Sequence, residues 1–418
     1  MPDTVSAAGR TPPPEPEQVL PAYGSRSLSE VVPSLLAALG APGEPNALGI
    51  EPARRVCLLL VDGLGHHQLA EHAADAPFLS ALAAASTTAD PAEDTATKPA
   101  AGRGNGGALT AGFPSSTPIS LASLGTGAPP GAHGVLGVSF EAGQGELLES
   151  IKWTTHRGGR PVDQREELPP ERVQPLETAL ARAGRGGMDV RVVSSVAFDG
   201  SGLTRAALRG GVYRGVHALG DLTAELITAL SAPPPVLCYG YHAQLDLLGH
   251  VHGPGSLAWR MELAVVDRVA ALVAEALPPD GLLMVTADHG MITVDPGQRV
   301  DADTDPVLRA GVRLVGGDPR ARHVYTEPGA AADVLAAWTE RLHGRAWVVP
   351  GERAIADGWF GPAVSDAARP RIGDVVVAMR GSAAVTRSRA ERILSTLPGQ
   401  HGSLTAAEQH IPLLLRRG

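Results

Sequence analysis

Apolar runs of strand length alternate with amphipathic segments along most of the chain. The apolar runs cover residues 54–65, 189–198, 235–243 and 281–291, and helical patterns cover 27–39, 173–184, 219–231 and 257–277. Short buried strands that alternate with amphipathic helices indicate an α/β fold with a mostly parallel sheet. In such a sheet, ligands bind beyond the carboxyl ends of the strands.

Three segments depart from this pattern and suggest how the chain is divided. Residues 1–25 are rich in proline and polar residues, which predicts a disordered tail. Residues 84–112 are of low complexity, so we expect a flexible surface insertion there. A further strand–helix–strand pattern over 300–372 suggests a small inserted cap. The α/β core would then comprise residues 26–299 and 373–418.

Composition narrows the class of protein. The 418 residues are 44% hydrophobic and carry a formal net charge of −9. This charge argues against a basic groove for nucleic acid, although bound metal ions would still permit a phosphate substrate. No apolar run approaches the ~18 residues of a membrane span, and the N-terminus lacks a secretory signal pattern. We therefore expect a soluble cytoplasmic protein, with Cys57 and Cys238 as buried free thiols.

Acidic and imidazole side chains gather where the predicted strands end. Asp62 follows the run that begins at 54, and the pair Asp288–His289 follows the run that begins at 281. Asp246 and His250 are four residues apart, so one helical turn places both on the same face. Each feature alone is also compatible with a turn or a solvated surface. Three further histidines are weaker candidates, namely His242, His252 and, between glycines, His401.

Taken together, these residues indicate a metal site. A mixture of carboxylate and imidazole groups suits Zn²⁺ first and Mn²⁺ as the alternative. The chain has only two cysteines, which excludes a closed cysteine-rich zinc site. Two divalent ions about 3.5–4 Å apart can promote an in-line displacement at phosphorus. We therefore expect two divalent ions and a small phosphate ester as substrate.

The order of five short motifs resembles that of the alkaline phosphatase superfamily, and most closely its nucleotide pyrophosphatase/phosphodiesterase family. The motifs are VDG at 61–63, FPSST at 113–117, DLLGHVHGP at 246–254, ADHGM at 287–291 and GQHG at 399–402. The resemblance implies a three-layer α/β/α sandwich. It also implies that Asp62, Asp288 and His289 hold one ion, to which the nucleophile Thr117 binds. Asp246, His250 and His401 would hold the other.

Other residues of these motifs have weaker or different implied roles. Ser115 and Ser116 are alternatives to Thr117 as the nucleophile. His133 matches a family histidine that does not bind metal, so we interpret it as structural.

The chain departs from the family pattern near the expected phosphate. Relatives carry an asparagine shortly after the motif histidine, and here Val138 occupies the matching position. We therefore expect the backbone N–H groups of Ile119 and Ser120, at the start of a helix, to bind the phosphoryl oxygens. Tyr241 is a candidate to line the substrate site, with a core role as the alternative.

The resulting hypothesis is a hydrolase that cleaves phosphodiester or nucleotide pyrophosphate bonds through a phospho-threonine intermediate. The first alternative is a phosphomonoesterase or phosphonate hydrolase on the same scaffold, which the loss of the asparagine favours. A non-catalytic, metal-stabilised relative is the alternative of another class. A mutase would use serine and carry a large domain soon after the nucleophile, and this chain has neither. The sequence leaves the physiological substrate and the oligomeric state open.

Overall fold

A six-stranded sheet forms the centre of the computed structural model, which describes residues 18–88, 107–143, 145–157 and 160–418. The strand order is β20 (Leu414–Arg417), β10 (Gly281–Thr286), β1 (Arg55–Val61), β9 (Val236–His242), β7 (Asp189–Ser195) and β8 (Val212–Val216). All neighbouring pairs are parallel except β10–β20, which is antiparallel. The predicted α/β class with a mostly parallel sheet is confirmed.

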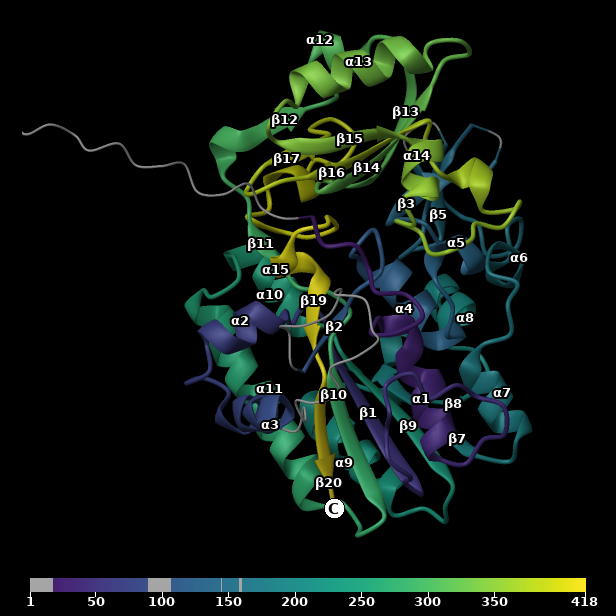
Figure 1. Ribbon diagram of the computed structural model, residues 1–418, viewed down its shortest axis with the longest axis vertical. Coiled ribbons are helices and arrows are strands. Elements are labelled where there is room, and N and C mark those ends of the chain that lie inside the picture. The colour runs from purple at the N-terminus through teal and green to yellow at the C-terminus, as the bar shows by residue number, and fades with distance from the viewer. Residues whose placement is uncertain (1–17, 89–106, 144, 158–159) are drawn as a thin grey trace, which may run out of the picture.

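Helices cover both faces of this sheet, which is why the central strands are apolar without alternation (Figure 1). One set consists of α3 (Pro77–Thr88), α9 (Leu219–Leu230) and α11 (Leu257–Glu275), and the other of α1 (Val31–Ala38), α4 (Thr117–Thr126), α7 (Ala179–Arg185) and α8 (Gly202–Ala207). Six of the seven residues of β1 are buried, and Cys57 lies opposite Cys238 of β9. Both thiols are free and buried.

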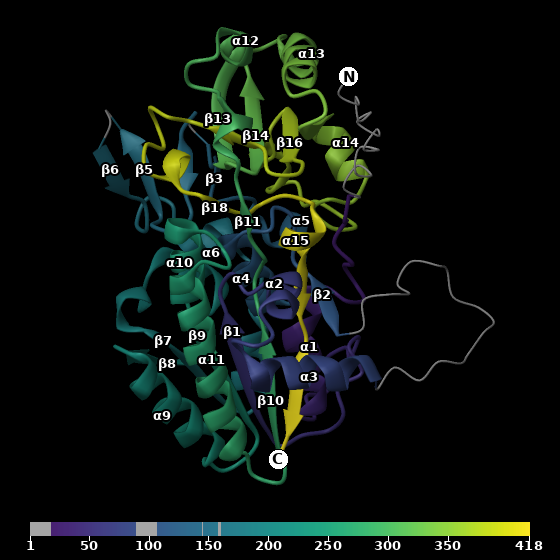
Figure 2. The same cartoon turned by 90° about the vertical axis from the view of Figure 1, so that its left-hand side faces the viewer.

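A smaller unit lies beyond the carboxyl ends of the central strands (Figures 1 and 2). Its antiparallel sheet has the order β13 (Val312–Asp318), β14 (Ala321–Thr326), β16 (Val375–Met379) and β15 (Ala346–Pro350), and α13 (Ala331–Arg341) packs on it. A separate core that includes Val324, Trp338 and Val377 holds the unit together.

The predicted end of the cap at residue 372 falls inside this smaller unit. β16 pairs with both β14 and β15, and β17 (Ala384–Thr386) pairs with β12 (Arg299–Asp301). The sheet of the unit therefore draws on residues that the sequence analysis gave to the core. The apolar sequence of β16 resembles that of a core strand, and its position in a sheet depends on distant partners.

A second accessory sheet was not predicted. It consists of β3 (Ser139–Glu141), β4 (Leu147–Glu149), β5 (Thr154–Arg157) and β6 (Arg160–Asp163), joined in that order. Figure 2 shows β3, β5 and β6 beside the smaller unit, and Arg313 of β13 pairs with Glu141 at 2.7 Å. These strands are short and rich in charged residues, so they lack an apolar run.

The predicted disordered tail is wrong for residues 18–25. The N–H of Val19 donates to the carbonyl of Leu404 at 2.8 Å, and that of Ala22 donates to the Thr110 hydroxyl at 2.8 Å. The Tyr23 hydroxyl accepts from the N–H of Phe113 and donates to the carbonyl of Trp359, each at 3.0 Å. These bonds fix the segment between the two units. Residues 1–17 lie outside the described part of the chain.

The predicted flexible insertion at 84–112 includes helical or strand residues at both of its ends. Helix α3 continues to Thr88, and β2 (Ala108–Thr110) is a buried strand that pairs with β19 (His410–Pro412). Residues 89–106 lie outside the described part. Within the described residues, no helix is both long and apolar enough to cross a membrane.

Candidate active site

The first cluster of site residues lies at the carboxyl ends of two adjacent strands. Asp62 follows β1 and Asp288 follows β10, and these strands are parallel neighbours. The His289 Nε2 atom lies 3.5 Å from Asp62 Oδ1 and 3.4 Å from Asp288 Oδ2. The other oxygen of Asp288 accepts the N–H groups of Gly63 and His289, both at 3.0 Å. These bonds leave Asp288 Oδ2 directed toward the cluster.

The second cluster combines helix α10 (Gln244–His252) with the loop after β18 (Gly399–Gln400). One helical turn separates Asp246 from His250, whose Nε2 atom lies 3.4 Å from Asp246 Oδ2. His401 Nε2 lies 3.2 Å from His250 Nε2 and 3.8 Å from Asp246 Oδ1. The rings of His289 and His401 are stacked with centroids 3.5 Å apart, so the two clusters adjoin.

Backbone carbonyls orient all three imidazoles in the same way. The Nδ1 atom of His250 lies 2.8 Å from the carbonyl oxygen of Gly399. That of His289 lies 3.1 Å from the carbonyl oxygen of Gly290. That of His401 lies 2.9 Å from the carbonyl oxygen of Ser115. A carbonyl only accepts, so Nδ1 carries the proton and Nε2 keeps its lone pair. Metal-binding histidines are commonly held in this way by a carbonyl or carboxylate. The geometry therefore presents three Nε2 lone pairs to one region.

Three unpaired carboxylate oxygens are further evidence that the site suits cations. Asp62 Oδ1, Asp288 Oδ2 and Asp246 Oδ1 are buried and have no hydrogen-bond donor among the described residues. Burial, together with the nearby Asp288 and Asp246 carboxylates, raises the pKa of Asp62 well above its ordinary value. Burial also raises the pKa of Asp246. Buried carboxylates of this kind are stable when a metal ion neutralises them, so the residues fit divalent ions.

Within the part of the chain that the structure describes, two groups of possible metal ligands have ligand atoms that all lie within 4.8 Å of one another. They are Asp62, Asp288 and His289, and Asp246, His289 and His401. The first group is the predicted protein ligand set of one ion. In the second group His289 replaces the predicted His250, which nevertheless lies next to both Asp246 and His401.

The nucleophile candidates differ sharply in their surroundings. Thr117 is the first residue of α4, and its hydroxyl lies 3.2 Å from His289 Nε2. The Ser115 hydroxyl donates to the carbonyl of Ser403 at 2.8 Å. The Ser116 hydroxyl is buried and faces the Asp318 carboxyl, whose pKa it lowers through a hydrogen bond. Of the three hydroxyls, that of Thr117 is bonded to a predicted metal ligand.

The expected role of Ser120 in phosphate binding does not agree with its hydrogen bonds. Its N–H donates to the carbonyl of Ser116 at 3.0 Å, and its hydroxyl donates to the carbonyl of Asp288 at 2.7 Å. Both groups of Ser120 therefore already have hydrogen-bond partners, and Ser120 joins the Asp288 loop to α4. The N–H of Ile119 belongs to the first turn of α4, where helix N–H groups lack intrahelical partners.

Tyr241 contacts the first cluster directly. Its hydroxyl donates to Asp62 Oδ2, and its ring lies 6.2 Å from that of Phe198. Phe198 ends the short helix η2 (Val196–Phe198) after β7 and is 39% exposed. Phe198 was not predicted, although an aromatic residue just beyond a strand end is a usable signal.

The remaining histidines of the motifs lie outside both clusters. His242 Nε2 lies 2.8 Å from Glu262 Oε1. His252 is exposed at the end of α10. His133 accepts the N–H of Val135 on Nδ1, so its Nε2 donates to the Ser123 hydroxyl at 3.0 Å. Burial lowers the pKa of His133 to about 3, which agrees with a neutral structural residue.

Comparisons with known proteins bear on the family and the fold of the chain. A model of the family described as type I phosphodiesterase / nucleotide pyrophosphatase matches residues 56–404. Murine ectonucleotide pyrophosphatase / phosphodiesterase 5 aligns with a TM-score of 0.61 and 16% identity over 86% of this chain and 87% of that one. Phosphonoacetate hydrolase from Sinorhizobium meliloti 1021, in complex with phosphonoformate, aligns with a TM-score of 0.58 and 18% identity over 88% and 91%. At these low identities, the structural alignments show a shared fold alone.

A curated relative gives a more local match. Phosphopentomutase of Idiomarina loihiensis is 26% identical over 157 residues, which are 37% of this chain and 38% of the relative. The chain thus matches little more than a third of that protein's length.

Proposed function

The chain belongs to the type I phosphodiesterase / nucleotide pyrophosphatase family, and on that basis we propose that it hydrolyses phosphodiester or nucleotide pyrophosphate bonds with Thr117 as the nucleophile. The observation that carries this proposal is the position of the Thr117 hydroxyl, 3.2 Å from His289 Nε2 at the start of α4. The hydroxyl thus adjoins a cluster of unpaired carboxylate oxygens and imidazole lone pairs.

Two divalent ions, zinc first and manganese as the alternative, would be held by Asp62, Asp288 and His289 and by Asp246, His250 and His401. When bound, they would supply positive charge that favours ionisation of a hydroxyl and neutralises the phosphoryl oxygens. The fit of these residues to cations supports this assignment.

Thr117 would carry out the covalent chemistry. Its Oγ1 forms a bond to phosphorus while the bond from phosphorus to the leaving oxygen breaks, and the leaving group departs as an alcohol or phosphate. Water then attacks the phospho-threonine, which releases the product and restores the hydroxyl. The unpaired N–H groups in the first turn of α4 favour the negative charge that develops there.

The surroundings of the first cluster favour a diester over a monoester. Tyr241 and Phe198 present aromatic surface beside Asp62, and this surface suits an apolar or nucleoside group on the phosphate.

A second candidate function is hydrolysis of a phosphomonoester or phosphonate. It is favoured by Val138, which stands where relatives carry an asparagine that donates to the phosphoryl group.

A substrate panel would separate the two functions. Protein loaded with zinc would be assayed on matched aryl monoesters, aryl diesters, nucleotide pyrophosphates and a phosphonate. We expect the highest kcat/KM for a diester or pyrophosphate. Phe198→Ala should raise KM for these substrates by about tenfold, because stacking is lost. A higher kcat/KM for the monoester or the phosphonate would overturn the diester assignment and support the second candidate.

A further inference from the structure

Glu408 is a buried carboxylate with donors on both oxygens. Arg320 donates from Nε to Oε1 at 3.1 Å and from Nη2 to Oε2 at 2.7 Å, and both side chains are fully buried. Oε1 also accepts the N–H of Ser403 at 3.0 Å, and Oε2 accepts the Thr405 hydroxyl. A buried ion pair with this many hydrogen bonds holds its partners in a defined geometry.

The backbone around Glu408 joins the loops that carry the predicted ligands. Its carbonyl accepts the N–H of Gly290, the residue after His289, at 2.9 Å. Its side chain binds Ser403, two residues after His401. Glu408 therefore connects the loop of one stacked histidine to the loop of the other.

The next residue extends the connection to the nucleophile loop. Gln409 Nε2 donates to the carbonyls of Gly112 and Ser403, at 3.1 and 3.0 Å. Ser115 then binds the same region, because its N–H donates to the carbonyl of Gly402 at 3.0 Å. The loops that carry His289, His401 and Thr117 therefore meet at residues 408–409.

Arg320 ties this junction to the smaller unit. Its guanidinium donates to the carbonyls of Ala383 and, at 3.3 Å, Met379. The Ser403 hydroxyl donates to the same Met379 carbonyl at 2.6 Å. Loss of the Glu408 charge would leave a buried guanidinium without its counter-ion and release the loop that it holds.

We propose that Glu408, held by Arg320, is a positioning residue that sets the spacing of His289 and His401 and thereby the affinity of the site for divalent ions. This inference rests on the proposed function, since it assumes that these histidines bind metal. Neither Glu408 nor Arg320 bonds to a predicted ligand side chain, so the effect passes through the loops. Residues that orient metal ligands typically change metal affinity by about 10- to 100-fold when they are replaced.

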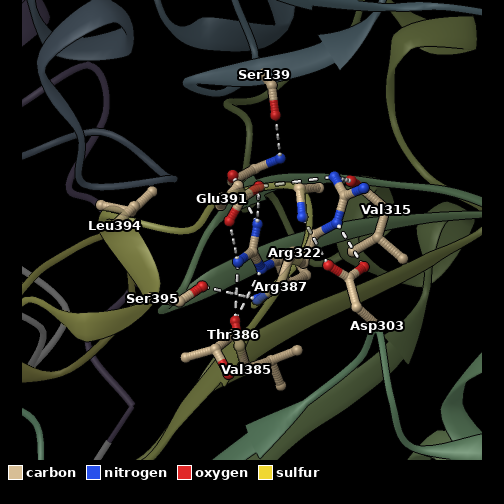
Figure 3. Close-up of polar contacts among 12 residues, drawn as sticks. Ser139, Asp303, Val315, Arg322, Val385, Thr386, Arg387, Glu391, Leu394 and Ser395 are labelled. Carbon is tan, nitrogen blue, oxygen red and sulfur yellow. Dashed lines mark hydrogen bonds and ion pairs between the residues drawn. The ribbon is translucent and has the colours of Figure 1, made fainter. Parts of the chain in front are cut away.

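The chain offers a control in a second ion pair, formed by a buried arginine and a partly buried glutamate (Figure 3). Arg322 is fully buried and binds Glu391 through two bonds, of 2.9 and 2.7 Å. It also donates to the carbonyls of Val385 and Gly317. Among the described residues, these contacts lie within the smaller unit and its flanking segment, and none reaches a ligand loop.

The test compares Glu408→Gln with Glu391→Gln in the full-length protein. Zinc affinity of the metal-free variants would be measured by competition with a chelator, together with melting temperature and, separately, kcat and KM. We expect both variants to melt at a lower temperature than the wild type. Only Glu408→Gln should weaken zinc binding, by about 10- to 100-fold, and its kcat should recover at excess zinc.

Two results would overturn the inference: wild-type zinc affinity in Glu408→Gln, or an equal loss in Glu391→Gln. If Glu408→Gln does not fold, Arg320→Lys and Arg322→Lys provide the same comparison, because lysine keeps the charge but loses the two-bond geometry. A wild-type protein that binds no zinc would overturn this inference and the metal assignment together. If zinc binds but Thr117→Ala retains full activity, only the nucleophile assignment fails, and zinc affinity still decides the role of Glu408.

Discussion

The hydroxyl of Tyr23 accepts the N–H of Phe113, four residues before Thr117, at a distance of 3.0 Å. The same hydroxyl donates to the carbonyl of Trp359 in the smaller unit. A residue near the N-terminus thus supports the loop that presents the proposed nucleophile, and its removal should affect catalysis as well as stability.

We expect Tyr23→Phe to lower the free energy of unfolding by about 1–3 kcal/mol, because two backbone groups lose their partner. It should also lower kcat by about tenfold through misplacement of Thr117. Tyr325→Phe is the control, since the Tyr325 hydroxyl likewise accepts an N–H, from Glu141, and donates to a carbonyl, of Arg371. Denaturant unfolding and steady-state kinetics would check both. An equal loss of kcat in Tyr325→Phe would contradict the role of Tyr23.

Replacement of Thr117 should lower turnover without a comparable loss of stability. Thr117→Ala should lower turnover by about 10³-fold or more while both metal ions stay bound, because the attacking oxygen is lost. Thr117→Ser should retain part of the activity, since the hydroxyl survives. Ser116→Ala is the control, because its hydroxyl is buried and contacts the Asp318 carboxyl rather than a predicted metal ligand, and it should remain active. Near wild-type turnover in metal-loaded Thr117→Ala would sink the nucleophile assignment.

Metal removal should abolish hydrolysis and reduce stability. The purified protein should contain two divalent ions per chain by elemental analysis. Exhaustive chelation should stop turnover, and each ion at about 1,000 times its Kd should contribute about 4 kcal/mol to the free energy of unfolding. Zinc added back should restore the melting temperature and the activity together. Full activity in the metal-free protein would exclude the two-ion mechanism.

Asp318 should make stability depend on pH. Burial raises its pKa to about 7, although Arg322 and Ser116 lower it and the carboxylates of Glu391 and Glu408 raise it. A raised folded pKa means that the folded protein holds the proton more tightly than the unfolded chain does. The stabilisation is therefore complete below pH 4 and is lost as the pH rises through about 7.

Asp318→Asn removes this titration. It should raise the free energy of unfolding at pH 8 relative to wild type by up to about 4 kcal/mol, and by less at pH 5. Urea unfolding of both proteins at the two pH values would measure the difference. A difference that does not change between pH 5 and pH 8 would show that Asp318 does not titrate in this range.

Local sequence patterns predicted the part of the fold that is repetitive. β1, β7, β9 and β10 are apolar because helices cover both of their faces, and each was recognised from that property. Asp62 and the pair Asp288–His289 could be located because parallel strands bring their carboxyl ends to one edge. For these residues, a place just after a predicted strand was enough to predict a place at this edge of the sheet.

Residues whose roles depend on distant partners could not be predicted in this way. Arg320 and Glu408 are charged and are 88 residues apart, so each alone resembles a solvated side chain. Tyr23 lies in a proline-rich segment whose order depends on Phe113 and Trp359. The position of β16 in the smaller sheet likewise depends on β14 and β15, which the sequence of β16 does not reveal.

The hydrogen bond from His401 to the carbonyl of Ser115 spans 286 residues of sequence, and this separation has a consequence for biosynthesis. The ribosome releases the nucleophile loop and all five of the parallel strands well before residues 399–409 emerge. A domain generally folds as a unit. A nascent chain that has released Asp62 and Thr117 therefore still lacks the junction at Glu408 and the imidazole of His401. The proposed site is therefore complete only after residues 399–409 have joined the strands that were synthesised before them.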